Sequence, residues 1–238
     1  MILHVVERAL AASNVTRAIV ATDDERILEC VRNAGHEAVM TSKEHQSGSD
    51  RLAEVAAQLD EADVIVNVQG DEPLISPATI ERAVDELLNA DEAQIVTTCE
   101  AITDAADVLS ADVVKVVSDA GGRALYFSRA PIPYPRDAVK RHGSLENALA
   151  RDATLLAMFR KHTGLYVYRR GFLLEYTAWP QSELERTESL EQLRALERGA
   201  VIKVLEAAAP SIGVDTAEDL ERVRALMEVQ GSKFKLQG

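Results

Sequence analysis

The chain has 238 residues, of which 47% are hydrophobic and 27% are charged, so it is long enough to bury a proper core. A formal net charge of −13 argues against a protein that binds nucleic acid, because such a protein needs a basic stripe for the phosphate backbone. No apolar run approaches the roughly 18 residues of a membrane span and no signal-peptide pattern is visible. Two distant cysteines without CxxC spacing fit a reduced, cytoplasmic protein.

From residue 1 to about residue 117, short apolar runs alternate with amphipathic stretches. The runs are rich in Val and Ile and predict strands at 17–22, 37–42, 64–68, 93–98 and 113–117. The stretches repeat apolar residues at helical spacing and predict helices at 1–12, 23–35, 49–59 and 76–90. This alternation predicts an α/β protein with a mostly parallel, doubly wound sheet, in which ligands bind beyond the carboxyl ends of the strands.

Capping signals mark several predicted helix ends. Thr22 with Glu25 has the spacing of a helix start, and Gly35 suits the end of the same helix. Ser76 directly before Pro77 predicts another helix start.

The second half of the chain has a different pattern. Residues 113–129 predict an antiparallel hairpin around a Gly-Gly turn, and the prolines of 130–136 predict an extended segment. A polar and then helical excursion follows. The remaining predicted elements are a strand at 162–169, a helix at 189–199, a strand at 201–207 and a closing helix at 213–229. We therefore expect a single domain, residues 1–238, with an embedded lobe at about residues 113–170.

The chain opens directly on a predicted helix, whereas in a doubly wound sheet the first helix follows a central strand. Neither a GxGxxG nor a GxxxxGK[ST] phosphate loop is present in the sequence. We therefore expect an upstream strand and loop of roughly 25 residues to be absent from this chain.

Two acidic residues are candidate metal ligands. Asp71 follows the predicted buried strand 64–68, and Asp215 stands between an apolar lead-in and a predicted helix. Hard cations take carboxylate oxygens, and two acids from separate strand ends could hold Mg²⁺ beside a phosphate. The alternative is that Asp71 and Glu72 cap the turn before the next helix.

Other polar residues are candidate ligand contacts. The stretch "HQSGSDR" (45–51) joins a strand end to a helix and can bring backbone amides to a base or sugar, although Ser47 and Ser49 equally suit helix caps. His162 lies beside a predicted strand and could meet a carboxylate, or it is a surface histidine. Basic residues cluster in sequence and suit a small anionic ligand or a solvated face: Arg123, Arg129, Arg136, Lys140, Arg141, Lys161, Arg169 and Arg170.

Several longer motifs occur in matching order from residue 2 to about residue 227: "HQSGSDR", "NVQGDEPLI", "VKVV", "ALYFSRAPIPY", "KHTGLYVYR", "LEQLRALERG" and "GVDTAEDLERV". With these motifs the chain resembles the 3-deoxy-manno-octulosonate cytidylyltransferases, or CMP-Kdo synthetases. The resemblance implies a Rossmann-like nucleotidyltransferase fold. It also implies a Mg²⁺-dependent reaction in which CTP and 3-deoxy-manno-octulosonate (Kdo) give CMP-Kdo and pyrophosphate for lipopolysaccharide synthesis.

The same resemblance implies roles for individual residues. Asp71 and Asp215 would be the catalytic, metal-binding carboxylates. The cytidine side would be lined by His45, Ser47, Gly48 and Arg51. The sugar-acid side would be lined by Gln69, Arg129, His162, Tyr166, Glu191 and Gln192, with Arg129 and His162 as donors to the Kdo carboxylate. The hairpin and the "APIPYPR" segment would help to form a homodimer.

The family begins with a strand and a loop of the form "IPARxxSTRLPxKPL", which grips the triphosphate, and this chain starts after it. We therefore expect weak CTP binding by these 238 residues. Two alternatives stay open: a cytidylyltransferase for another sugar acid or for methylerythritol phosphate, and an inactive homologue that only dimerises or regulates.

Overall fold

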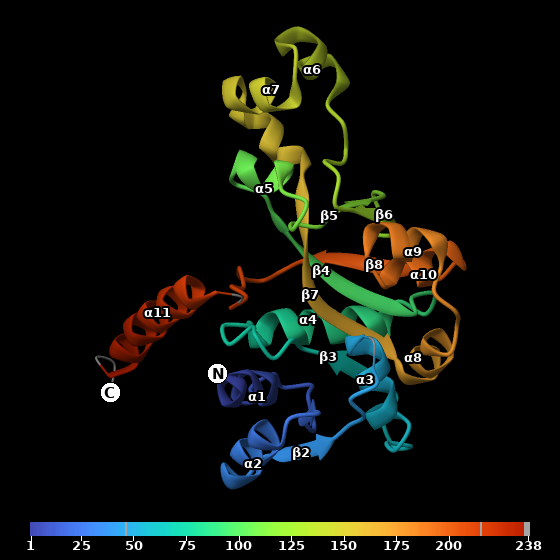
Figure 1. The fold of residues 1–238 in the computed structure, drawn as a ribbon, viewed down its shortest axis with the longest axis vertical. Coiled ribbons are helices and arrows are strands. Elements are labelled where there is room, and N and C mark those ends of the chain that lie inside the picture. Colours follow the sequence, from blue (N-terminus) through green and yellow to red (C-terminus); the bar gives the residue numbers. More distant parts are fainter. Residues whose placement is uncertain (46, 215, 236–238) are drawn as a thin grey trace. The chain divides into compact units, whose positions relative to one another are not determined.

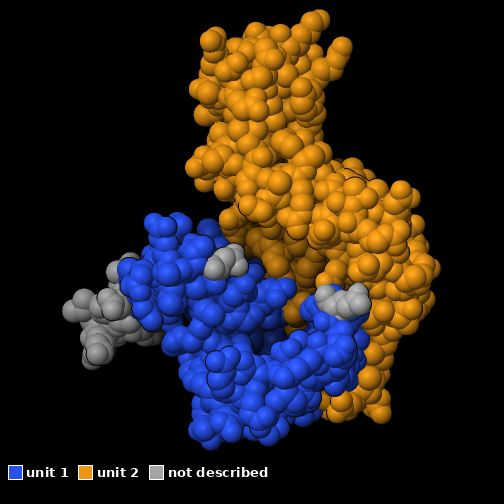
Figure 2. Space-filling view, viewed as in Figure 1, with its two compact units in different colours: residues 1–55, 68–82, 208–238 blue, residues 56–67, 83–207 orange. Residues whose placement is uncertain are grey.

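The computed structural model describes residues 1–45, 47–214 and 216–235. The chain forms two compact units, which Figure 2 shows in blue and orange. Unit 1 comprises residues 1–55, 68–82 and 208–238, and unit 2 comprises residues 56–67 and 83–207. The predicted lobe at about residues 113–170 lies wholly within unit 2, and its identity as a separate lobe stays a prediction.

Unit 1 is built on two parallel strands, β1 (Ile19–Thr22) and β2 (Glu37–Met40). Its helices are α1 (Ile2–Leu10), α2 (Glu25–Asn33), nearly all of α3 (Gly48–Ala56), the start of α4 (Pro77–Asn89) and α11 (Ala217–Lys235). The helix periodicity places apolar side chains of α1 and α2 on the faces that cover the two strands. The resulting core comprises Val6, Val20, Leu28, Val31 and Ala38.

Unit 2 contains a mixed six-stranded sheet. Its strands are β3 (Val64–Asn67), β4 (Ile95–Ala101), β5 (Lys115–Ser118), β6 (Ala124–Ser128), β7 (Arg160–Arg169) and β8 (Ile202–Glu206). The long strand β7 pairs antiparallel with β3, β4 and β5, while β4 pairs in parallel with β8 (Figure 1). Strands β3, β4, β5 and β8 therefore share one direction, and β7 and β6 oppose it.

Unit 2 also contains the helices that lie between its strands in the chain. Helix α5 (Ala105–Leu109) follows β4. After β6 come α6 (Arg136–His142), α7 (Leu145–Arg151) and the 3₁₀ helix η1 (Ala153–Met158). A small core of Ile102, Val108, Leu145, Leu149 and Phe159 joins them. After β7 come α8 (Arg170–Thr177), α9 (Glu183–Glu188) and α10 (Gln192–Glu197).

The predicted α/β class is confirmed, and the predicted strands and helices of the first half are all present. The 113–129 hairpin is antiparallel as expected, with Gly122 at φ 78° in its turn. Gly35 follows α2 with φ 82°, as a left-handed glycine cap does. Among the described residues, no helix has the length and apolar character that crossing a membrane requires.

One predicted cap is wrong. Asp24, rather than Thr22 with Glu25, is the N-cap of α2, and its carboxylate accepts from the amide of Arg26 at 2.8 Å. Thr22 stands one step earlier, where its hydroxyl accepts from the amide of Asp24 at 3.1 Å. The carboxylate is the stronger acceptor for the free amides of the first turn, and the Arg26 guanidinium bonded to it lowers the pKa of Asp24 to about 2.

Candidate active site

Asp71 lies in a turn of unit 1 shortly after the end of β3. Its carbonyl oxygen accepts from the amide of Val214 at 2.9 Å, so the backbone that leads into Asp215 runs beside it. Asp71 is half-buried, and no hydrogen bond or ion pair engages its carboxylate among the described residues. Gln69, in the same turn, is exposed, and its carbonyl accepts from the amide of Glu72 at 3.2 Å.

Of the two predicted metal ligands, Asp71 and Asp215, the structure describes only Asp71. Asp215 lies outside the described residues. Over the described ranges, no three His, Cys, Asp or Glu side chains gather in a way that could hold a metal ion. Asp71 itself fits such a ligand, because its carboxylate is partly shielded, is not neutralised by any basic side chain of the described residues, and offers hard oxygen atoms.

The residues of the predicted cytidine side lie around the start of α3 in unit 1. Ser47 caps this helix, with its hydroxyl accepting from the amide of Asp50 at 3.2 Å, so the capping alternative is confirmed for Ser47. Ser49 lies inside α3 and is not its cap. Gly48 has open space where a side chain would project. The Arg51 guanidinium donates to the hydroxyl of Thr41 at 2.5 Å and lies 3.2 Å from the carboxylate of Asp23.

His45 contacts the carboxylate of Glu54 on α3 through Nε2. This contact, together with the amide of Ser42, lowers the pKa of the Glu54 carboxyl. This contact ties His45, which follows β2 in the chain, to α3.

Arg129 is the best-held cation of the predicted sugar-acid side, in unit 2. Its guanidinium donates to three carbonyl oxygens, those of Glu188 at 2.7 Å, Ala111 at 2.9 Å and Ser189 at 3.4 Å. Carbonyls orient a guanidinium without neutralising it, and two of its five N–H bonds remain for a further acceptor. The Glu188 carboxylate is occupied by the Arg129 amide at 2.9 Å and the Ser128 hydroxyl at 2.6 Å.

Glu191 and Gln192 follow the segment that holds Arg129. The Glu191 carbonyl accepts from the hydroxyl of Tyr176 at 2.9 Å. Gln192 is 6% exposed, and its Nε2 is a buried donor that no acceptor in the described part of the chain satisfies. A buried donor without an acceptor is destabilising, and an acceptor atom of a bound ligand would satisfy it.

His162 and Tyr166 lie on β7. The His162 ring is 5.2 Å from the edge-packed ring of Phe127 and 5.2 Å from the ring of Tyr166. Burial among these groups lowers the pKa of His162 to about 3 and raises the pKa of Tyr166 well above its usual value. The ring row continues from Tyr166 to Tyr168 and then to Tyr176, which holds Glu191.

In unit 2, His162 contacts Tyr166, and the ring row from Tyr166 leads to Tyr176 and the Glu191 carbonyl. Arg129 is bound to Glu188 and Ser189, in the segment that precedes Glu191 and Gln192, and we call these predicted residues of unit 2 the Arg129 cluster. Gln69 belongs to unit 1, as do the predicted metal and cytidine residues.

Sequence reasoning missed the residues that support this cluster. Lys115 is fully buried, and its ammonium donates to the carbonyls of Ser110 at 2.7 Å, Val113 at 2.5 Å and Arg129 at 2.6 Å. A lysine in the middle of the apolar run "VVKVV" was the available signal. Nothing comparable in the sequence marks Glu188, whose role depends on contacts with residues far away along the chain.

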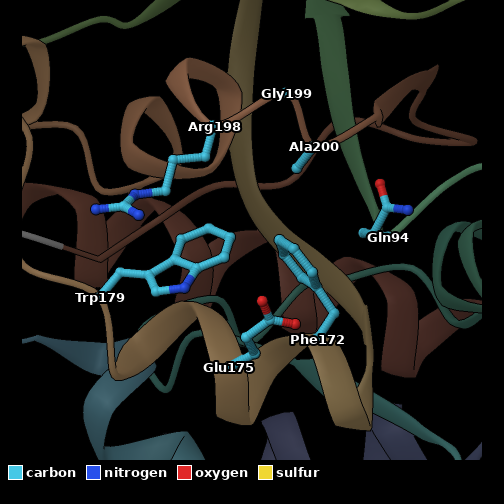
Figure 3. Close-up of a pocket in the computed structure, with 7 residues that line it drawn as sticks. All are labelled: Gln94, Phe172, Glu175, Trp179, Arg198, Gly199 and Ala200. Atoms are coloured by element: carbon cyan, nitrogen blue, oxygen red, sulfur yellow. The ribbon is translucent and has the colours of Figure 1, made fainter.

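Unit 2 also has a pocket of about 430 Å³ (Figure 3). Arg198 lies over the ring of Trp179, with 4.8 Å from its guanidinium carbon to the ring centroid. The complete lining is Gln94, Phe172, Glu175, Trp179, Arg198, Gly199 and Ala200. None of the predicted site residues is part of this lining.

Comparisons with known proteins show to which family the chain belongs. The profile of the Cytidylyltransferase family matches residues 1–205. A 3-deoxy-manno-octulosonate cytidylyltransferase of Trichlorobacter lovleyi is 51% identical over 228 residues, which cover 96% of this chain and 88% of that relative. The protein of the same name from Marinobacter nauticus is 51% identical over 236 residues, 98% of this chain and 89% of its own.

Solved structures give the same result. A CMP:2-keto-3-deoxy-manno-octonic acid synthetase complexed with CTP matches with a TM-score of 0.84 and 43% identity, covering 96% of this chain and 88% of its own. A putative glucose-1-phosphate thymidylyltransferase from Bacillus anthracis, at 14% identity and a TM-score of 0.60, covers 94% of this chain and 81% of its own and shows the fold alone. The predicted Rossmann-like nucleotidyltransferase fold is thereby confirmed.

Proposed function

Because the chain belongs to the 3-deoxy-manno-octulosonate cytidylyltransferase family, we propose that it transfers CMP from CTP to Kdo and releases pyrophosphate. The observation that carries this proposal is identity of about half of all residues along nearly the whole chain. The product would serve lipopolysaccharide synthesis.

The charge distribution in unit 2 supports a sugar acid as the acceptor. The described acceptors of the Arg129 guanidinium are carbonyl oxygens, and two of its N–H bonds remain for a carboxylate. The buried amide of Gln192 would donate its unused hydrogen bond to a sugar oxygen. We also assign Gln69 of unit 1, and His162, Tyr166 and Glu191 of unit 2, to contacts with the sugar acid.

Unit 1 would hold the nucleotide and the metal. Asp71 and Asp215 would be the Mg²⁺ ligands, and His45, Ser47, Gly48 and Arg51 would line the cytidine. Bound Mg²⁺ supplies charge neutralisation on the phosphates and lowers the pKa of a hydroxyl nearby. The open space at Gly48 lets a base or ribose approach the start of α3 without meeting a side chain.

We also propose a homodimer in the cytoplasm. Edge strand β6 exposes Leu125 (59%), and the segment after it exposes Tyr134 (60%); both are apolar surface that a second copy could cover. Two free cysteines fit a reducing compartment.

Pyrophosphate release with CTP, Mg²⁺ and a panel of acceptors tests the proposal. The panel contains Kdo, its amino analogue, sialic acid and methylerythritol phosphate. The assay uses the 238-residue chain and the same chain preceded by the family's N-terminal strand and loop. Turnover with Kdo above the other acceptors by either version supports the function. Preference for another acceptor would change the substrate, and a folded dimer inactive in both versions would favour the non-catalytic alternative.

Asp71→Asn separates the metal proposal from the fold. The substitution conserves shape and removes the charge, so we expect Mg²⁺-dependent turnover to be lost while the circular dichroism spectrum is unchanged. Normal turnover by this variant would show that Asp71 is not a metal ligand.

A further inference from the structure

A buried threonine links His162 to the backbone of its own strand. The hydroxyl oxygen of Thr97, on β4, lies 2.8 Å from the carbonyl oxygen of Leu165 and 2.9 Å from Nε2 of His162. Thr97 is fully buried, so water does not compete for these contacts.

The two contacts of the Thr97 hydroxyl share a single hydroxyl proton, and this fixes which atom is the donor in each hydrogen bond. Two oxygens 2.8 Å apart need a proton between them, and a carbonyl has none to give. The single hydroxyl proton of Thr97 therefore goes to Leu165. The Thr97 oxygen can then only accept from His162, which requires the proton of the ring to be on Nε2.

The ring is neutral in this environment. Its neighbours are the rings of Phe127 and Tyr166, and it forms no ion pair with a carboxylate among the described residues. Burial moves the pKa of His162 to about 3, far below neutral pH. A neutral imidazole protonated on Nε2 carries a lone pair on Nδ1.

Nδ1 is open to a ligand. No described residue bonds to it, and His162 is partly exposed, so the lone pair remains available to a ligand.

We propose that Thr97 is a positioning residue that fixes the Nε2–H tautomer of His162, so that Nδ1 accepts a hydrogen bond from a hydroxyl of the sugar acid. This inference rests on the proposed function. It changes the role expected from the sequence, because an accepting Nδ1 cannot donate to the Kdo carboxylate. Arg129 binds the carboxylate, and His162 distinguishes a hydroxyl from a group that cannot donate.

Nitrogen-15 NMR of the chain's five histidines reads the tautomer directly, with His162→Gln used for assignment. In the wild type we expect the His162 ring to carry its proton on Nε2 and none on Nδ1. Its nitrogen signals should not shift between pH 5 and 8. Thr97→Val removes the acceptor while keeping the shape, and should mix the two tautomers. Thr97→Ser restores the hydroxyl and should restore the signal.

Thr98→Val is the matched control. Thr98 is the neighbouring buried threonine, and its hydroxyl contacts Thr163 instead of His162, so this variant should leave the His162 signal unchanged. In kinetics, Thr97→Val should raise KM for Kdo about ten-fold, the loss expected for one misdirected hydrogen bond, with KM for CTP within about two-fold. Thr97→Ser and Thr98→Val should keep the wild-type KM for Kdo.

Each part of the inference can fail separately. A cationic or Nδ1–H ring in the wild type overturns the tautomer assignment, whether or not the enzyme turns over and whether or not Thr97→Val folds. The contact to the sugar is overturned if the protein makes CMP-Kdo and the ring carries its proton on Nε2, but saturating Kdo does not shift the Nδ1 signal. Absence of any turnover with an Nε2–H ring counts against the proposed function instead.

Discussion

The buried ion pair between Arg194 and Glu185 gives the sharpest test of how unit 2 is held together. The side chains are 5% and 4% exposed, and the guanidinium reaches both carboxylate oxygens at 2.8 Å. Arg194 also donates to the carbonyl of Trp179 at 2.8 Å and lies 5.0 Å from the centroid of the Tyr176 ring. Glu185 in turn closes the capping box of Ser182 at the start of α9.

Arg194→Met should be strongly destabilising. Removing one partner of a buried pair costs about 3–5 kcal/mol, because the remaining charge is left uncompensated. The hydrogen bond to Trp179 adds about 1 kcal/mol, so we expect the free energy of unfolding to fall by about 4–6 kcal/mol. In Arg194→Met/Glu185→Gln the remaining group is neutral and keeps the cap, so we expect about 2 kcal/mol to be recovered.

The single tryptophan of the chain, Trp179, lies beside this pair and reports the unfolding of unit 2. Urea titrations followed by Trp179 fluorescence give the free energy of unfolding of the wild type, of Arg194→Met and of Arg194→Met/Glu185→Gln. Asp60→Asn is the control, because Asp60 is 94% exposed in its pair with Arg170, which also lies in unit 2, and this variant should lose no more than about 0.5 kcal/mol. A loss below about 1 kcal/mol for Arg194→Met, or a double variant no more stable than the single one, would refute the reasoning.

Three further predictions concern single residues. Arg129→Lys cannot reproduce the three-carbonyl fork, so KM for Kdo should rise at least about ten-fold with KM for CTP nearly unchanged in the pyrophosphate assay; equal changes in both would contradict a role confined to the sugar acid. Gln192→Leu removes a buried unmade donor, so urea titration should show a stability gain of about 1 kcal/mol while turnover falls, and a loss in stability would show that Nε2 is satisfied in solution. Burial raises the pKa of the Cys99 thiol to about 11, so at pH 8 a thiol reagent should modify exposed Cys30 rapidly and Cys99 only in denaturant; two fast thiols in the native protein would contradict this.

Much of the fold follows from local patterns. The strands and helices of the first half are set by periods of two and 3.6 residues, which the sequence displays directly. Strand direction is another matter. The apolar alternation of 162–169 predicts a strand but not that β7 runs antiparallel between β3 and β4, because direction depends on pairing with residues far away along the chain.

The site shows the same division. Motif resemblance found Arg129 and Gln192, but local sequence cannot show that Arg129 is held by carbonyls of Glu188 and Ser189, 59 and 60 residues away. The unsatisfied donor of Gln192 exists only once the chain around it is packed. Thr97 lacked any sequence signal, because a threonine in a strand is ordinary until its partners are known.

The division into units has a consequence for synthesis on the ribosome. The chain passes between the units at 55/56, 67/68, 82/83 and 207/208, so unit 1, which contains the N-terminus, is the last to have all its residues. Unit 2 has its full set once residue 207 emerges, and can complete its sheet while unit 1 still waits. A nascent chain arrested between residues 207 and 214 would therefore carry all of unit 2, the Arg129 cluster included, and would lack the Val214 amide that bonds to Asp71.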